Sequence, residues 1–457
     1  MRVFRTVQPL KCFTPAQNLA SPLFYAYPYF SAPSTLTAFT HVLRASDRAW
    51  DSLRRIPYST PGRWVQALDL SRISCTTGAE RLAVDTLLTQ LFPLTPFLAR
   101  LVLNNTVRMS RRAMLALAAR EGAGLLRVLK GVKWEGTGGW WGGAEGEEDP
   151  LLTLVRASVG LEELEVFGPG LLDEDEDGAG AGAPHVNTTP RPYPYPYPSL
   201  CLPNLHSLMI LSLPRSPLLA HLIASPLPSL LHLMVTPYDG VPSALTSALV
   251  ATHGARLHTL AFHTPRVWPP VRARTPATLL HTSPQLRALS LTAPLPALAA
   301  PPAVPAVPAV PVTSGGHALP EMQLPSDIHS PLGVHAPSGI HSPSGIHASS
   351  GIHALSELYA PCDMYAPSGV PMTGHPLRIL SLPRPDAAYL YKLEAWLYLG
   401  LLQCLEEVHM REVRWIRAGV TSRAAEAGVQ GDMKEWKRRL GRWRVRVVDV
   451  SGREDVG

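Results

Sequence analysis

Histidine, a common metal ligand, recurs at a fixed spacing in one stretch of the chain. From residue 317 to residue 370 the sequence repeats every six residues, as in SGIHSPSGIHASSGIH at 338–353. Six repeats begin with histidine: His317, His329, His335, His341, His347 and His353. Two later repeats begin with Tyr359 and Tyr365, and no carboxylate or thiolate is placed to complete a ligand set. We therefore expect no functional metal site here and no cofactor in the protein.

The hexads allow two other interpretations. A left-handed β-helix also uses six-residue repeats, with Ile340, Ile346 and Ile352 at one corner, and would imply an acyltransferase-like enzyme. Nine repeats make only about three coils, the minimum for a stacked fold, and the recurring prolines remove hydrogen-bond donors. A low-complexity insert is the interpretation we favour, because one aliphatic residue per hexad cannot offset about 1–2 kcal/mol of backbone ordering per residue.

Two charged segments could also bind ligands. DEDED at 173–177 lacks the spaced ligands of a calcium loop and indicates a solvated linker. WKRRLGRWRVR at 436–446 interleaves Trp436 and Trp443 with cations, a pattern found in proteins that bind single-stranded nucleic acid. The same residues fit a helix that ends at Gly441 and is followed by a strand, and we favour this, so nucleic acid is not an expected partner. No nucleophile elbow, phosphate loop or HExxH motif is present, and we expect no enzyme.

A second, less regular repeat predicts the elements of the fold. Its pattern is apolar-x-x-apolar-x-apolar, and it occurs as VQALDL (65–70), LARLVL (98–103), LEELEV (161–166), LHSLMI (205–210), LLHLMV (230–235), LHTLAF (257–262), LRALSL (286–291), LRILSL (377–382), LEEVHM (405–410) and VRVVDV (445–450). A weaker copy is LLRVLKGVKW at 125–134. Several spacings of 25 to 29 residues suit a leucine-rich-repeat unit. Units of this kind must stack to bury their apolar face, so the pattern predicts a parallel sheet.

Helical patterns separate several of these copies. SRRAMLALAARE has Ser110 at its amino end, and SALTSALVATHG runs from Ser243 to Gly254, where a carboxyl-terminal cap is expected. A third helix is expected to start at Asp386. The predicted fold class is therefore α/β, an irregular leucine-rich-repeat solenoid with a parallel strand and a helix per unit, interrupted by disordered low-complexity inserts.

Side-chain alternation along each strand predicts a binding surface. Positions 4 and 6 of the pattern face the interior, so positions 3 and 5 point the other way and line the concave face of the solenoid. This face is predicted to carry Glu163, Glu165, Ser207, Met209, His232, Met234, Thr259, Glu407 and His409. Adaptable Met and His side chains suit protein recognition, although ordinary exposed strand residues would show the same pattern.

The chain is expected to divide into four regions. Residues 1–60 form a helical amino-terminal cap, 61–291 a solenoid with inserts at 135–150 and 173–198, 292–376 the Pro/His-rich hexad insert, and 377–457 the last repeat units. Cys12, Cys75, Cys201, Cys362 and Cys404 are scattered, which predicts free thiols and a cytoplasmic or nuclear location. The longest uncharged run has proline at every third residue, so no membrane span is expected.

The segment from Leu10 to Ser71 resembles the region that follows the F-box in fungal F-box proteins with leucine-rich repeats. Pro22, Leu23, Phe24 and Tyr25 match the family's LLY motif, and VQALDL matches its first repeat strand. The resemblance implies a substrate receptor of a cullin–RING ubiquitin ligase, with 1–60 as a remnant of the F-box region. The usual LPxE opening is absent and few residues precede Pro22. We therefore expect weak binding, or none, to the ligase adapter, and a protein substrate as the main partner.

Overall fold

The computed structural model describes residues 25–51, 60–133, 149–168, 199–211, 217–236, 245–263, 278–291, 299–301, 374–415 and 424–454. The contacts between residues divide the chain into two compact units. The larger comprises Met1–Val304 and Gly374–Gly457 and contains all the described elements. The smaller, Pro305–Thr373, lies outside the described residues, and so do the nine hexads and the interpretations placed on them.

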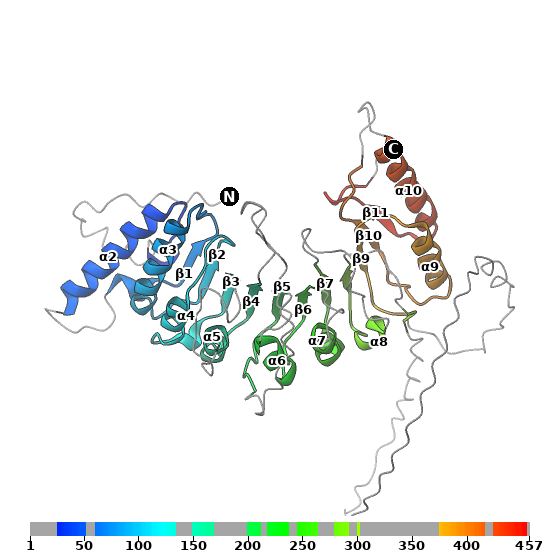
Figure 1. Cartoon of the computed structure of the whole chain (residues 1–457). Coiled ribbons are helices and arrows are strands. Elements are labelled where there is room, and N and C mark those ends of the chain that lie inside the picture. Colours follow the sequence, from blue (N-terminus) through cyan, green and yellow to red (C-terminus); the bar gives the residue numbers. More distant parts are fainter. Residues whose placement is uncertain are drawn as a thin grey trace, which may run out of the picture. The chain divides into compact units, whose positions relative to one another are not determined.

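One parallel sheet forms the centre of the larger unit (Figure 1). Its strands are β1 (Ala67–Leu70), β2 (Arg100–Leu103), β3 (Val128–Lys133), β4 (Glu163–Phe167), β5 (Ser207–Leu211), β6 (His232–Val235), β7 (Thr259–Phe262), β8 (Ala288–Ser290), β9 (Ile379–Leu382), β10 (Glu407–Met410) and β11 (Arg446–Val448). Each strand pairs with the next along the chain, so the spatial order equals the sequence order. The α/β class and the stacked parallel sheet predicted from the sequence are confirmed in this unit.

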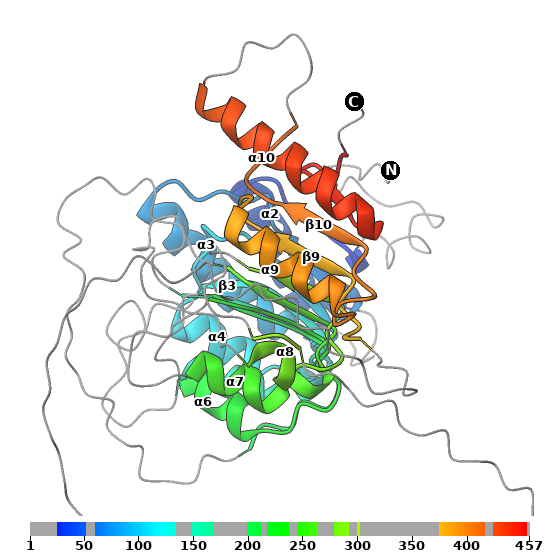
Figure 2. The ribbon, with the colours of Figure 1, turned by 90° about the vertical axis from the view of Figure 1, so that its right-hand side faces the viewer.

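In the sequence most helices come between two successive strands, and in space they lie on one side of the sheet (Figure 1). They are α2 (Pro33–Asp51), α3 (Gly78–Leu91), α4 (Arg111–Ala118), α5 (Pro150–Ala157), α6 (Pro217–Ala224), α7 (Leu245–His253), α8 (Leu279–Thr282), α9 (Ala387–Tyr398) and α10 (Ala424–Leu440). From α2 to α8 each helix contacts the next, and α6, α7 and α8 lie side by side in Figure 2. None of the helices in the described ranges has the length and hydropathy of a membrane span.

The repeat pattern coincides with each of the eleven strands in the described ranges, and its weak copy forms β3. Position 4 of the pattern makes a continuous ladder, as in Leu208, Leu233 and Leu260 of β5, β6 and β7, which pair in register. All three are at most 1% exposed. The sheet is thus held against its helices by a column of buried leucines, and fully burying each contributes about 1.5–3 kcal/mol.

The helix starts predicted at Ser110 and Asp386 are confirmed. The Ser110 hydroxyl accepts a hydrogen bond from the Ala113 N–H at 3.3 Å, and the Asp386 carboxylate accepts one from the Tyr389 N–H at 3.2 Å. Ser243 lies outside the described residues. Gly254 does not act as a left-handed cap; it begins a 3-10 turn, and a Cβ there would lie 2.8 Å from the Thr282 carbonyl oxygen. Glycine is needed at this position for close approach to the next unit.

The frame predicted for the last strand is wrong by one residue. Val447, not Val448, pairs with Val408, and Val450, predicted to be buried, is 48% exposed. The buried place belongs to Asp449, whose side chain accepts N–H groups from Trp415 at 3.2 Å and Arg453 at 3.0 Å. A polar residue is stable there because those hydrogen bonds close the turn that follows the final strand.

Interruptions of the repeat follow the carboxyl ends of strands. Stretches outside the described residues begin directly after β3 and β5, and within a few residues after β4, β6, β7, β8 and β10. The short connection into each strand from β2 onward is described. The longest lies between β8 and β9, which nevertheless pair directly, with Ala288 opposite Ile379. No strand of the described chain intervenes, so the repeats on either side of the insert are consecutive units.

Candidate binding surface

The nine residues predicted to form a binding face fall in two rows on the side of the sheet opposite the helices, here called the helix-free face. The position-3 row contains Glu163, Ser207, His232, Thr259, Ala288, Ile379 and Glu407, and the position-5 row contains Glu165, Met209, Met234, Ala261, Ser290, Ser381 and His409. Every neighbour within each row is a register partner, so both rows are continuous from β4 to β10. His232 is exposed and the other eight predicted residues are partly exposed.

The two ends of the rows carry ions that are already paired. At the β4 end, Lys130 of β3 forms an ion pair with Glu163. This hydrogen bond holds the pKa of the Glu163 carboxyl below its usual value, whereas burial raises the pKa of Glu165. Charge reversal at Glu163 would therefore break an internal contact as well as any contact with a partner.

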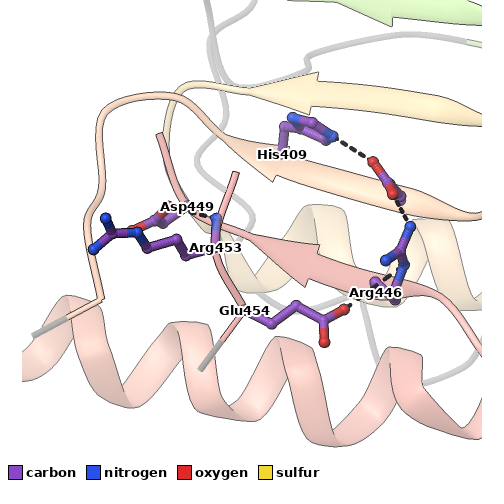
Figure 3. Close-up of polar contacts among 6 residues, drawn as sticks. His409, Arg446, Asp449, Arg453 and Glu454 are labelled. Carbon is purple, nitrogen blue, oxygen red and sulfur yellow. Dashed lines mark hydrogen bonds and ion pairs between the residues drawn. The ribbon is translucent and has the colours of Figure 1, made fainter. Parts of the chain in front are cut away.

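The β10 end carries a second network (Figure 3). His409 Nε2 lies 2.8 Å from Glu407 Oε2, and Arg446 of β11 binds the other oxygen of the same carboxylate. Arg446 Nε also lies 3.7 Å from the Glu454 carboxylate. Ser381 is the register partner of His409, but within the described ranges no hydrogen bond joins their side chains. The geometry is that of an oriented His–Glu pair without the bonded nucleophile of a Ser–His–acid site.

A group of cations beside His232 was missed by the sequence argument. His206 and His258 precede the position-3 residues of β5 and β7, and Arg287 precedes that of β8. Burial, and then the charges of His206 and His258, lower the pKa of His232, so the three imidazoles are close enough to interact. The sequence does place a basic residue at position 2 of LHSLMI, LHTLAF and LRALSL, and this recurrence could have indicated the group. The strand pattern sets no requirement at position 2.

The basic segment at 436–446 forms the predicted helix and strand. Helix α10 ends at Leu440, and the turn Gly441–Trp443 leads into β11. Trp436 is 1% exposed and belongs to the core, whereas Trp443 is 39% exposed and packs edge-to-face on Tyr398. Three of its arginines are engaged in ion pairs: Arg438 with Glu435, Arg439 with Glu394, and Arg446 with Glu407.

In the described ranges, no group of three or more His, Cys, Asp or Glu side chains is placed to hold a metal ion. Cys75, Cys201 and Cys404 are free thiols, and Cys75 is buried. The hexad histidines and the DEDED segment lie outside the described residues.

Neither a family model nor a curated protein matches the chain. The function is therefore inferred from the two rows and the basic side chains beside them.

Proposed function

We propose that the protein is a non-enzymatic binding scaffold that takes a partner protein on its helix-free face. Its resemblance to F-box leucine-rich-repeat proteins suggests the class of role, that of a ubiquitin-ligase substrate receptor. The observation that carries the proposal is the continuity of the two rows across seven strands. At a spacing of about 4.8 Å per strand they extend over about 29 Å, enough for a protein interface of ordinary width.

The middle of this surface has the composition of a recognition site. Between β5 and β9 the two rows hold Ser, Thr, Ala, Met and Ile side chains with one histidine and no carboxylate. Met209 and Met234 are register partners at its centre and are partly exposed. Thioether side chains adapt to a partner's surface, and charged groups are depleted at the centres of protein interfaces.

Affinity capture with mass spectrometry tests the proposal. Met209→Asp combined with Met234→Asp places two uncompensated charges in the centre of the surface, and we expect it to abolish recovery of the partner. Leu82→Asp is the matched control, because Leu82 is 52% exposed on helix α3. Partner recovery should survive that change. Equal recovery with the Met209 and Met234 variant, in a protein with an unchanged circular dichroism spectrum, would exclude the helix-free face.

A further inference from the structure

A strip of three histidines and one arginine borders the helix-free face where its strands begin. It consists of His206 before β5, His232 at the start of β6, His258 before β7 and Arg287 before β8, here called the amino-edge cluster. Backbone hydrogen bonds fix the spacing: the His232 N–H donates to the His206 carbonyl at 2.9 Å, and the Arg287 N–H donates to the His258 carbonyl at 2.8 Å. The cluster is therefore set by the sheet and not by loop geometry.

The carboxylates nearest the cluster already have partners. On the β4 side, Glu162 pairs with Arg127 at 3.3 Å, and Glu163 pairs with Lys130. On the β9 side, Glu406 pairs with Arg378 at 3.6 Å. Within the described part of the chain, no carboxylate forms an ion pair with any member of the cluster. The Glu163 carboxylate, besides its pairing with Lys130, also interacts electrostatically with His206, so a positive charge on His206 is offset in part. In the same ranges His232, His258 and Arg287 form no such ion pair, and positive charge on these three members is not offset by one.

An apolar row runs beside the cluster. Met209, Met234 and Ala261 are register partners, three residues after His206, two after His232 and three after His258. Successive residues of the same parity point to the same face, so Met234 and His232 share that face. The surface therefore presents a cationic edge and an apolar strip side by side, with a span from β5 to β8 of about 14 Å, or about ten residues of helix.

We propose that the partner docks through an acidic amphipathic segment, with its carboxylates over His206, His232, His258 and Arg287 and its apolar side chains over Met209 and Met234. This inference rests on the proposed binding function and names the chemistry of the partner. Charge complementarity selects an acidic segment over a basic one, because protonated imidazoles and the Arg287 guanidinium repel cations.

Binding is expected to tighten as the pH falls. Burial and the neighbouring imidazoles lower the pKa of His232, so this side chain is neutral in the free protein near neutral pH. Protonation of His232 at lower pH adds a positive charge to the cluster, and glutamates of the partner are still ionised near pH 5.5.

Fluorescence anisotropy of the full chain with labelled synthetic peptides tests the inference. The probes are amphipathic helices of about sixteen residues with Glu, Gln or Lys on the polar face. We expect the Glu peptide to bind about tenfold more tightly than the Gln peptide near pH 5.5, and to weaken near pH 7.5. Equal binding of the Glu and Gln peptides, preference for Lys, or no binding of any peptide would overturn the inference.

Matched variants locate the effect. The variant with His206→Gln, His258→Gln and Arg287→Gln should lose the preference for Glu. The control, with His41→Gln, His281→Gln and Arg442→Gln, removes the same residue types from exposed positions outside the rows and should bind within about twofold of the parent chain. An equal loss in the control would mean that net charge, not the cluster, attracts the peptide.

The inference and the proposed function fail in different ways. If a captured partner is lost with the Met209 and Met234 variant but retained by the cluster variant, the scaffold role stands and the acidic segment is wrong. If neither variant affects the partner, both are wrong.

Discussion

Ala288 and Ile379 pair in neighbouring strands, although the whole segment 292–376 lies between them in the sequence. The buried imidazole of His375 strengthens this junction: its Nε2 donates to the Ser283 carbonyl at 3.1 Å, and its Nδ1 accepts the Leu377 N–H at 3.2 Å. The contacts that join β8 to β9 thus come from residues at the two borders of the insert.

The first prediction follows from this junction. Replacing residues 302–373 by a flexible linker of about ten residues should change the midpoint of thermal unfolding by no more than about 2 °C, because every described strand pair is retained. Differential scanning calorimetry measures the midpoint. A large fall, or strong amide protection within the hexads of the parent chain, would show that the insert is folded and would favour a β-helix.

The second prediction concerns a glycine inside β3. Gly131 has φ +77°, and a Cβ at this position would lie 2.2 Å from the Leu103 carbonyl oxygen. Gly131→Ala should therefore lower the free energy of unfolding by about 3 kcal/mol. Gly428→Ala, on an open part of helix α10, should instead raise it by up to about 1 kcal/mol. The pairing of β3 with β4 shifts register between Leu129 and Val132, a bulge that contains Gly131. Urea denaturation separates the two variants, and a neutral Gly131→Ala would contradict the strained backbone at this bulge.

The third prediction concerns the turn after β11. Asp449 is 3% exposed and accepts N–H groups from Trp415, Ser451 and Arg453. Asp449→Ala leaves these donors without their acceptor, which should cost about 2–3 kcal/mol of unfolding free energy. Asp432→Ala, at an exposed position of α10, is the control and should change it by less than about 0.5 kcal/mol. Similar losses in both variants would mean that the turn contributes nothing specific.

The fourth prediction concerns acid stability. Burial lowers the pKa of His375, and its hydrogen bonds oppose that shift only in part. The unfolded chain therefore binds the proton more readily, so stability is fully present above the unfolded pKa near 6.5 and is lost as the pH falls below it. His375→Gln should reduce the decline in unfolding free energy between about pH 7 and pH 5. The exposed control His41→Gln should keep the parent slope; identical slopes for all three proteins would assign the decline to other groups.

The strands were predictable because their apolar pattern depends on a few neighbouring positions of one unit. The frame of β11 was not, since the apolar pattern fits Val445, Val448 and Val450, whereas the pairing with β10 puts Val447 opposite Val408 and buries Asp449. The pairing of Glu163 with Lys130, and the meeting of His206 with His258 around His232, also depend on register between strands. A single sequence specifies which residues alternate along a strand but not which side chains meet across three of them.

The longer interruptions of the repeat follow strands in the sequence and do not occur within them. The pairing of β8 with β9 therefore does not depend on the number of hexads between them. Gain or loss of one hexad adds or removes six residues from a single connection and shifts no strand against its neighbour. The fold thus tolerates changes in the number of hexads, whereas a one-residue insertion near the start of β5 or β6 would move Met209 or Met234 to the opposite face of the sheet and remove it from the surface.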